Sequence, residues 1–196
     1  IVAAGVTTAT TALGHSVHVD AAGLEPDTWY AYRFRIGDEV SPVGRTRTFP
    51  APDASPEKLR LAVPNCQDYQ HGRYAAYADL VEQDLDVVLF LGDYIYEAPG
   101  LPTAEEALAQ RRYLGGFPVT LDDFRARYAI TPLDPHIAEA PAQLPWIITF
   151  DDHEVINNYA GDDGALAGVG DEFLERRAAA YQAWYENLPL RIEPPV

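Results

Sequence analysis

The stretch DVVLFLGDYIYE, residues 86–97, decides the fold of this chain. Residues 86–91 form a mostly apolar, β-branched run, which predicts a strand buried on both faces, as in parallel sheets. Gly92 breaks the strand and leaves Asp93 at its carboxyl end, where open α/β sheets bind ligands. Asp93 and Tyr96 are therefore candidate oxygen ligands for a metal ion. The alternative is that Asp93 only bonds its own turn.

The residues before this stretch extend it into a βαβ unit. Residues 59–63 (LRLAV) predict a first strand, which ends in a polar loop at Cys66. Apolar side chains at helical spacing predict a helix over 72–84, and the strand 86–91 follows it. Because a crossover connection makes two strands parallel and adjacent, Cys66 and Asp93 should lie at the same edge of the sheet.

A third buried strand is predicted over 145–150 (PWIITF), and it ends in the polar run DDHE, residues 151–154. Polar clusters thus follow three strands of one sheet, all at the edge that binds ligands. Thiolate, carboxylate, phenolate and imidazole groups together suit a trivalent or transition metal better than magnesium. A carboxylate between two cations could bridge them, as in two-metal sites that clamp a phosphoryl group.

Helices are predicted elsewhere in this part of the chain. Residues 98–142 should form two or three short helices over the same edge, with helix starts at Thr103 and Thr120. Apolar residues at helical spacing predict a further helix over 172–187.

Residues 1–50 have the pattern of an all-β segment, with strands predicted over 15–20, 28–36 and 43–49. The L-x-P-x-T-x-Y run of residues 24–30 resembles the corner of fibronectin type III sandwiches, where a tyrosine hydroxyl bonds back to the preceding backbone. Only three of the roughly seven strands of such a sandwich fit here. We therefore expect a partial sandwich, and a three-stranded meander is the alternative.

The composition of the chain limits the classes of partner that it could bind. Its 196 residues carry 30 acids against 14 bases, a net charge of −16, which argues against nucleic acid or an anionic membrane. No apolar run reaches the length of a membrane span. The absence of methionine suggests a processed product, a domain or a fragment. The single cysteine, Cys66, excludes an internal disulfide, and a buried apolar role is its alternative to metal binding.

Three stretches together resemble the alkaline phosphatase D family, a branch of the calcineurin-like metallophosphoesterases: GDYIYE (92–97), DDHEVINN (151–158) and RRAAAY…LPLR (176–191). The resemblance implies an α/β fold. Residues 58–196 would be the first half of a metallophosphoesterase-like core, built from βαβ units with parallel strands. A partial fibronectin-III-like β module (1–50) and a Pro-rich linker (51–57) would precede it.

The resemblance also implies a binuclear centre of Fe³⁺ and Ca²⁺, with other divalent metals as alternatives. Cys66 would be a thiolate ligand of iron, Asp93 the bridging carboxylate and Tyr96 a phenolate on Fe³⁺. Asp152 would ligate the second metal. His153 would be catalytic, near the leaving-group oxygen, as an acid or as a hydrogen-bond donor.

Several assignments have alternatives. Asp151, Asn157 and Asn158 would shape the site, but Asp151 could replace Asp152 as the ligand. Tyr96 could instead be a core or hydroxyl-bonded tyrosine, because Tyr94 is an equally good candidate for the core. His153 could be structural, as we expect for the remaining four histidines: His15, His18, His71 and His136.

The implied activity is hydrolysis of phosphate esters by a secreted or cell-envelope alkaline phosphatase or phosphodiesterase, with metal-activated water attacking phosphorus. Monoesters, diesters, phospholipid head groups and teichoic acids are all compatible. The family core has two sheets, so the three strands counted here leave an exposed sheet face that would be an association surface. One alternative is an incomplete fragment, or a half-enzyme that needs its missing C-terminal half or another chain. A non-enzymatic alternative is an adhesion-type module on a degenerate α/β domain.

Overall fold

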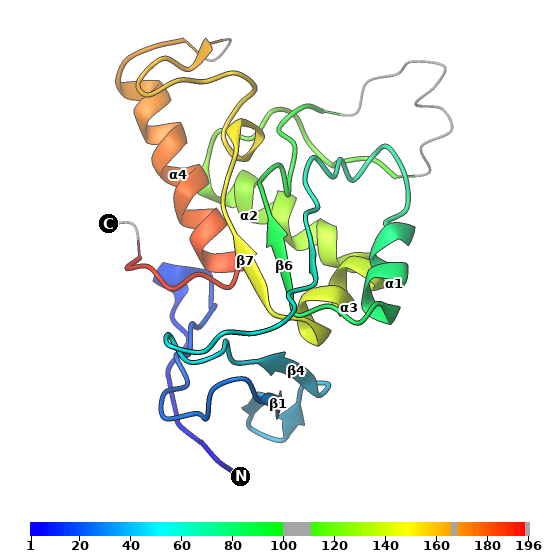
Figure 1. Ribbon diagram of the computed structural model, residues 1–196. Helices are drawn as coiled ribbons and strands as arrows, with labels where there is room; N and C mark the ends of the chain where they lie inside the picture. Colours follow the sequence, from blue (N-terminus) through cyan, green and yellow to red (C-terminus); the bar gives the residue numbers. More distant parts are fainter. Residues whose placement is uncertain (100–110, 166–167, 195–196) are drawn as a thin grey trace.

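The computed structural model describes residues 1–99, 111–165 and 168–194 (Figure 1). The predicted start of a helix at Thr103 lies outside these residues. The elements follow in this order along the chain: η1 (Thr11–Leu13), β1 (Trp29–Tyr32), β2 (Arg35–Ile36), β3 (Glu39–Val40), β4 (Gly44–Arg47), β5 (Leu61–Ala62), α1 (Ala75–Glu82), β6 (Val87–Phe90), α2 (Leu121–Ile130), η3 (Thr131–Leu133), α3 (Pro135–Gln143), β7 (Trp146–Ile148), η4 (Asp152–Glu154) and α4 (Asp171–Asn187).

The centre of the structure is a three-stranded parallel sheet in the order β5-β6-β7. In the register, Val88 of β6 lies between Ala62 of β5 and Trp146 of β7. The three predicted strands are thus present and shorter than expected, but only β6 is mostly buried, since the residues of β5 and β7 are half-buried or exposed. The crossover from β5 to β6 joins adjacent parallel strands as predicted, and β7 pairs with β6 in the same direction. All three strands deliver their carboxyl ends to one edge.

One face of the sheet packs on the helices. Phe90 is fully buried there, and its ring stacks on Trp146, which stacks in turn on Tyr77 of α1, at centroid distances of 5.6 and 6.0 Å. Helix α1 packs against α3, and α2 against α4 (Figure 1). The expected short helices therefore exist, but α2 and α3 lie behind and beside the sheet rather than over its carboxyl edge.

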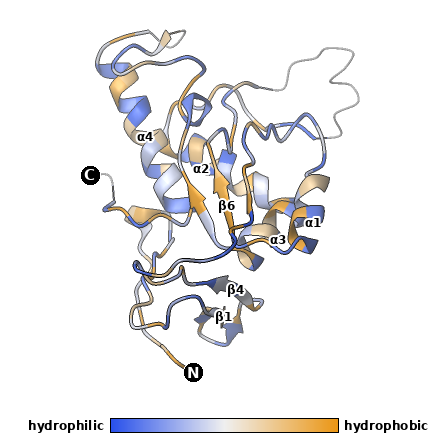
Figure 2. Cartoon of the chain, in the orientation of Figure 1, coloured by the Kyte–Doolittle hydropathy of each residue, from blue (hydrophilic) through white to orange (hydrophobic). Residues whose placement is uncertain are grey.

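The other face of the sheet is open. Leu61, Val63, Leu91 and Ile147, in the strands or just after them, alternate with less exposed neighbours, and each is at least 42% exposed. Figure 2 shows β6 and its apolar neighbours from this side, and no helix is drawn in front of them. The exposed sheet face that we expected is therefore present in the described part of the chain.

The N-terminal segment departs from the predicted sandwich. Residues 15–20 form no strand, because this segment packs on α4 instead of pairing its backbone: the His18 ring lies 4.2 Å from that of Tyr185, and its Nε2 is 3.1 Å from the carbonyl oxygen of Leu188. The predicted strand 28–36 is interrupted at residues 33–34. The described residues hold two separate two-stranded antiparallel sheets here, so the sandwich is not confirmed.

Short strands and polar contacts organise this segment. β1 pairs with β4, and β2 pairs with β3. The backbone N–H of Glu25 donates to the Tyr30 hydroxyl over 2.9 Å, so this hydroxyl contacts the preceding backbone as expected. Arg47 connects the segment to the core, because its guanidinium pairs with both Asp27 and Asp86.

No helix among the described residues is both long and apolar enough to cross a membrane.

Candidate metal centre

The loops that follow the three strands are joined by backbone contacts. The N–H groups of Cys66 and Gln67 donate to the carbonyl oxygens of Gly92 and Asp93 over 3.2 and 3.1 Å. Gly92 has a φ of +102°, and a Cβ there would collide with the backbone nitrogen of Asp151. Glycine is therefore required for the loop after β6 to approach the loop after β7 this closely.

A buried carboxylate fastens the second and third loops together. Glu154 is fully buried, and it accepts hydrogen bonds from three backbone N–H groups: Asp93 at 3.0 Å, Tyr94 at 2.5 Å and Asp151 at 2.7 Å. Burial raises the pKa of Glu154 to about 7, against the lowering effect of these three donors. Glu154 thereby fixes the backbone on both sides of the site.

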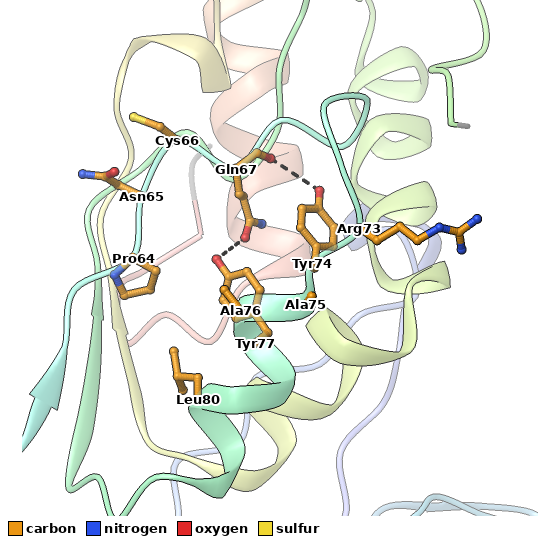
Figure 3. Close-up of a pocket in the computed structure, with 10 residues that line it drawn as sticks. All are labelled: Pro64, Asn65, Cys66, Gln67, Arg73, Tyr74, Ala75, Ala76, Tyr77 and Leu80. Atoms are coloured by element: carbon orange, nitrogen blue, oxygen red, sulfur yellow. Dashed lines mark hydrogen bonds between the residues drawn. The ribbon is translucent and has the colours of Figure 1, made fainter. Parts of the chain in front are cut away.

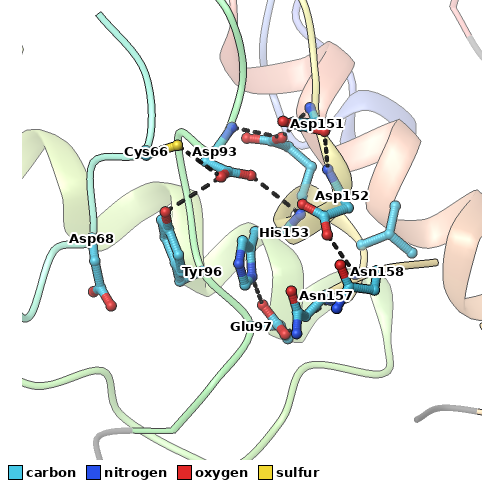
Figure 4. A network of polar contacts seen from close by, with 12 residues as sticks. Cys66, Asp68, Asp93, Tyr96, Glu97, Asp151, Asp152, His153, Asn157 and Asn158 are labelled. Carbon is cyan, nitrogen blue, oxygen red and sulfur yellow. Dashed lines mark hydrogen bonds and ion pairs between the residues drawn. The ribbon is translucent and has the colours of Figure 1, made fainter. Parts of the chain in front are cut away.

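Asp93 lies at the centre of the convergent side chains (Figure 4). Its Oδ2 accepts hydrogen bonds from the Cys66 thiol and the Tyr96 hydroxyl, each over 3.3 Å. Its Oδ1 accepts the backbone N–H of His153 over 3.3 Å. Asp93 is 4% exposed, so one buried carboxylate faces a thiol and a phenol with one oxygen and the third loop with the other.

The three acidic groups share one environment. Burial raises the pKa of the Asp93 carboxyl. Partial desolvation of the thiol, followed by the bond to Asp93, raises the pKa of Cys66, and burial with the negative charge of Asp93 raises that of Tyr96. A bound cation reverses this electrostatic effect, because it favours the ionised form of every group around it. The donor set therefore fits a metal ion.

Asp152 and His153 complete the cluster from η4. One ligand atom each from Asp93, Asp152 and His153 lie within 4.8 Å of one another, the spacing of a possible metal site. Asp151 caps η4 instead, since its Oδ1 accepts the backbone N–H of Asp152 over 3.0 Å. The backbone N–H of Asn158 donates to Asp152 Oδ2. Geometry thus favours Asp152 over Asp151 as the candidate ligand.

His153 has a defined orientation. Its Nδ1 lies 2.7 Å from Glu97 Oε2, and its ring stacks on Tyr96 with the centroids 4.2 Å apart. Burial lowers the pKa of this imidazole, but the hydrogen bond and charge of Glu97 outweigh burial and leave the pKa above its usual value. The same contact, with the N–H of Asn157, lowers the pKa of Glu97 against its burial.

The exposure and contacts of Cys66, Tyr94 and Tyr96 distinguish between the alternative roles of these residues. Cys66 is exposed, so a buried apolar role for it is wrong. Tyr94 is a core residue, 7% exposed, and its ring stacks on that of Tyr128. Tyr96 is the tyrosine whose hydroxyl reaches Asp93.

A pocket of about 280 Å³ adjoins the site between the loop at Cys66 and helix α1 (Figure 3). The hydroxyls of Tyr74 and Tyr77 line it and donate to Gln67, to the carbonyl oxygen and to Oε1 respectively. Asp93 does not line this pocket, so the pocket is a neighbour of the site and not its centre.

Sequence reasoning gave no role to Glu97 and Glu154, although each directly follows a predicted site residue. Their burial and their partners depend on how the loops fold. Arg127 and Arg176 were also missed, because buried arginines on amphipathic helices look like surface residues in sequence.

Comparison with known proteins identifies the family of the chain. The PhoD-like phosphatase family matches residues 61–195, and the N-terminal domain of PhoD-like phosphatases matches residues 1–50. The chain therefore belongs to the PhoD-like phosphatase family.

Two relatives show how much of the family this chain represents. It is 45% identical over 192 residues to alkaline phosphatase D of Bacillus subtilis (strain 168), covering 98% of this chain and 33% of that protein. It superposes on a solved structure described as the structure of PhoD with a TM-score of 0.88 and 44% identity, covering 96% of this chain and 36% of that one. The chain thus spans about a third of the length of these relatives.

Proposed function

We propose that this chain supplies metal ligands and a catalytic histidine to an enzyme that hydrolyses phosphate esters at a binuclear metal centre. The observation that carries the proposal is the position of Asp93: its Oδ2 contacts the Cys66 thiol and the Tyr96 hydroxyl, and one of its oxygens lies within 4.8 Å of ligand atoms of Asp152 and His153 (Figure 4). A carboxylate placed in this way suits a bridge between two cations. Membership of the PhoD-like phosphatase family supports the same activity.

The donors divide into two kinds. Cys66 and Tyr96, on the Oδ2 side of Asp93, would hold Fe³⁺, because thiolate and phenolate suit a trivalent or transition metal. Asp152, with a ligand atom within 4.8 Å of one from Asp93, would hold the second ion, Ca²⁺ or another divalent metal, because hard carboxylate oxygens suit it. When bound, the metal pair neutralises the phosphoryl oxygens and activates the water that attacks phosphorus.

The chain's own residues would orient the ester and assist the departing group. His153 lies next to Asp152 and is held on one side by Glu97, so its free edge can donate a hydrogen bond to phosphate or a proton to the leaving oxygen. Asn157 and Asn158 would shape the site from the loop after η4, where their backbone N–H groups contact Glu97 and Asp152.

Metal analysis and a visible spectrum of the purified chain test this proposal. Ferric iron bound by tyrosinate gives a purple charge-transfer band. We expect iron in the chain and such a band, and we expect Tyr96→Phe to abolish the colour. Tyr94→Phe is the matched control, because its phenol is buried in the core two residues away; this variant should keep the colour.

A colourless, metal-free chain after loading with iron would contradict the ligand set. With metal bound, hydrolysis of a phosphomonoester and of a phosphodiester should be compared, because both substrate classes fit the site. His153→Asn should then lower kcat by about 100-fold or more, which is the contribution typical of an acid–base group.

The open sheet face favours a second candidate: a catalytically incomplete half that needs further chain or a partner. Apolar residues of all three strands lie exposed on this face, and the relatives are about three times as long. In that case the chain would bind metal weakly and show no turnover. We further propose the division into 1–50, 51–57 and 58–196, and export from the cell or to its envelope, as the resemblance implies.

A further inference from the structure

Glu97 is a buried carboxylate with both oxygens occupied. It is 3% exposed; Oε2 lies 2.7 Å from His153 Nδ1, and Oε1 accepts the backbone N–H of Asn157 over 3.0 Å. A carboxylate accepts hydrogen bonds and cannot donate them when ionised, so this geometry requires the proton between Glu97 and His153 to belong to Nδ1.

The imidazole is fixed in three ways. The ring Nδ1 of His153 contacts Glu97, and one face of the ring stacks on Tyr96 at an interplanar angle of 29°. The backbone N–H of His153 donates to Asp93, which fixes the position of the residue that carries the ring. The other ring nitrogen, Nε2, is separated from Nδ1 by Cε1 in a rigid, planar ring, so its direction differs from that of Nδ1 by a fixed angle. Fixing Nδ1 therefore also fixes the direction of Nε2.

Two buried arginines, Arg127 and Arg176, interact with the charge of Glu97. Arg127 donates to the backbone oxygen of Glu97 over 3.2 Å and to that of Gly116 over 2.6 Å, while Arg176 donates to the backbone oxygen of Val155 over 3.2 Å. Both arginines are at most 7% exposed. Two buried guanidinium groups offset the desolvation of the carboxylate, which would otherwise be costly at this depth.

We propose that Glu97 is the positioning residue of His153: it fixes the Nδ1–H tautomer and directs Nε2 away from Glu97 for contact with the substrate. The use of Nε2 in catalysis rests on the proposed phosphoester hydrolysis. The tautomer and the ring orientation do not, because they follow from contacts within the metal-free chain.

Nitrogen NMR of the metal-free, ¹⁵N-histidine-labelled chain tests the proposal. Imidazole in water favours the Nε2–H tautomer. At about pH 9, where an ordinary histidine is neutral, His153 should instead carry its proton on Nδ1. A His153→Asn chain assigns the signal. A wild-type His153 that is mostly Nε2–H overturns the proposal.

Three variants locate the cause. Glu97→Leu removes the acceptor at similar volume and should return His153 to the Nε2–H tautomer, whereas Glu97→Gln keeps an acceptor oxygen and should retain Nδ1–H. Glu186→Leu is the matched control, since Glu186 is another buried acid held by an arginine, Arg125, but lies on α4; it should leave the His153 signal unchanged. Retention of Nδ1–H in Glu97→Leu overturns the proposal. If Glu97→Leu does not fold, the wild-type and Glu97→Gln spectra still decide.

Kinetics on the metal-loaded protein separate positioning from folding. Glu97→Leu should lower kcat by about ten- to a hundredfold with little change in KM. This loss should be no larger than the rate contribution of the acid–base group that Glu97 positions. The loss should be larger for esters with poorer leaving groups. A rise in KM at constant kcat would overturn the positioning role. Absence of any turnover in the wild type would contradict the proposed function, while the tautomer result would stand.

Discussion

Three site residues have backbone conformations that non-glycine residues seldom adopt. Cys66, Asp93 and Asn158 have φ values of 52°, 58° and 61°. Each such residue costs on the order of 1 kcal/mol and persists only where its surroundings determine it. Here the backbone contacts between the loops and the carboxylate of Glu154 provide that constraint. The directions of the ligand side chains are therefore set by the loops.

Gly92→Ala tests how closely the loops must approach. A methyl group at Gly92 would collide with Asp151, and φ of +102° disfavours alanine. We expect a loss of stability of about 2 kcal/mol or more in urea unfolding, with weaker metal binding. Gly115→Ala is the control: its φ is +84°, but nothing lies within 4 Å of the added Cβ. Equal losses in the two variants would show that the close contact with Asp151 is unimportant.

Glu154→Gln tests the carboxylate that joins the loops. Glutamine offers one acceptor oxygen to three backbone N–H donors, so at least one buried donor loses its partner. We expect the free energy of unfolding to fall by about 1–3 kcal/mol. Glu139→Gln, on the exposed surface of α3, should stay within about 0.5 kcal/mol of the wild type. Unchanged stability of Glu154→Gln in urea would contradict this role.

At the residue scale, sequence reasoning located the cluster because strand ends are visible in sequence. Cys66, Asp93 and His153 each follow an apolar run, and parallel strands bring such ends together. Glu97 and Glu154 carry no such signal, since their importance comes from burial and from partners in other loops.

Among the elements, helix α2 shows how local sequence fixes a start. Thr120 and Asp123 form a reciprocal capping box, in which the Asp123 N–H bonds the threonine side chain and Asp123 Oδ2 accepts the N–H of Thr120. The N–H and side chain of Thr120 lower the pKa of Asp123. The predicted helix start at Thr120 is confirmed.

Asp123→Asn should destabilise the protein in a pH-dependent way. Because the folded-state pKa is lowered, the ionised carboxylate stabilises the protein above its ordinary pKa range, and this stabilisation is lost as pH falls through the folded-state pKa. The difference from wild type should be about 0.5 kcal/mol at neutral pH, limited by solvent exposure, and should vanish in acid. Asp38→Asn, in an exposed turn, is the control in urea unfolding. A difference that persists in acid would contradict the carboxylate's role.

Helix patterns were more reliable than strand patterns in this chain. The helices predicted over 72–84 and 172–187 are present as α1 and α4, because their apolar residues repeat at helical spacing. The strand predicted over 15–20 was wrong, since alternation reports which side chains are buried and does not specify a backbone partner. His18 is half-buried, and its ring packs against Tyr185 of α4 and not in a sheet.

On the scale of the whole molecule, the open sheet face should make the isolated chain associate. The double variant Leu61→Thr, Ile147→Thr places β-branched side chains, which suit strands, at both positions but reduces the apolar area, and we expect it to weaken association about tenfold or more in sedimentation velocity. Leu114→Thr, 85% exposed and outside the sheet, should change nothing. A wild-type chain that stays monomeric at all concentrations would contradict the prediction.

The parallel direction of β5, β6 and β7 was predictable, and so was the meeting of their polar carboxyl ends at one edge of the sheet. The architecture of residues 1–50 was not, because its short strands pair in two separate sheets and its remaining segment packs on α4. The contacts with α4 join residues far apart in sequence, since His18 meets Tyr185.

The crossovers between β5, β6 and β7 also determine when the site forms during folding. Cys66, Asp93 and Asp152 are brought together only by pairing of strands distant in sequence, and non-local parallel pairing is slow because loop closure precedes its stabilising contacts. A metal ion added at the start of refolding would find its ligands assembled only near the end. The rate at which a metal–ligand absorption band grows would then report when the sheet is complete, while the circular dichroism signal of the helices would rise earlier.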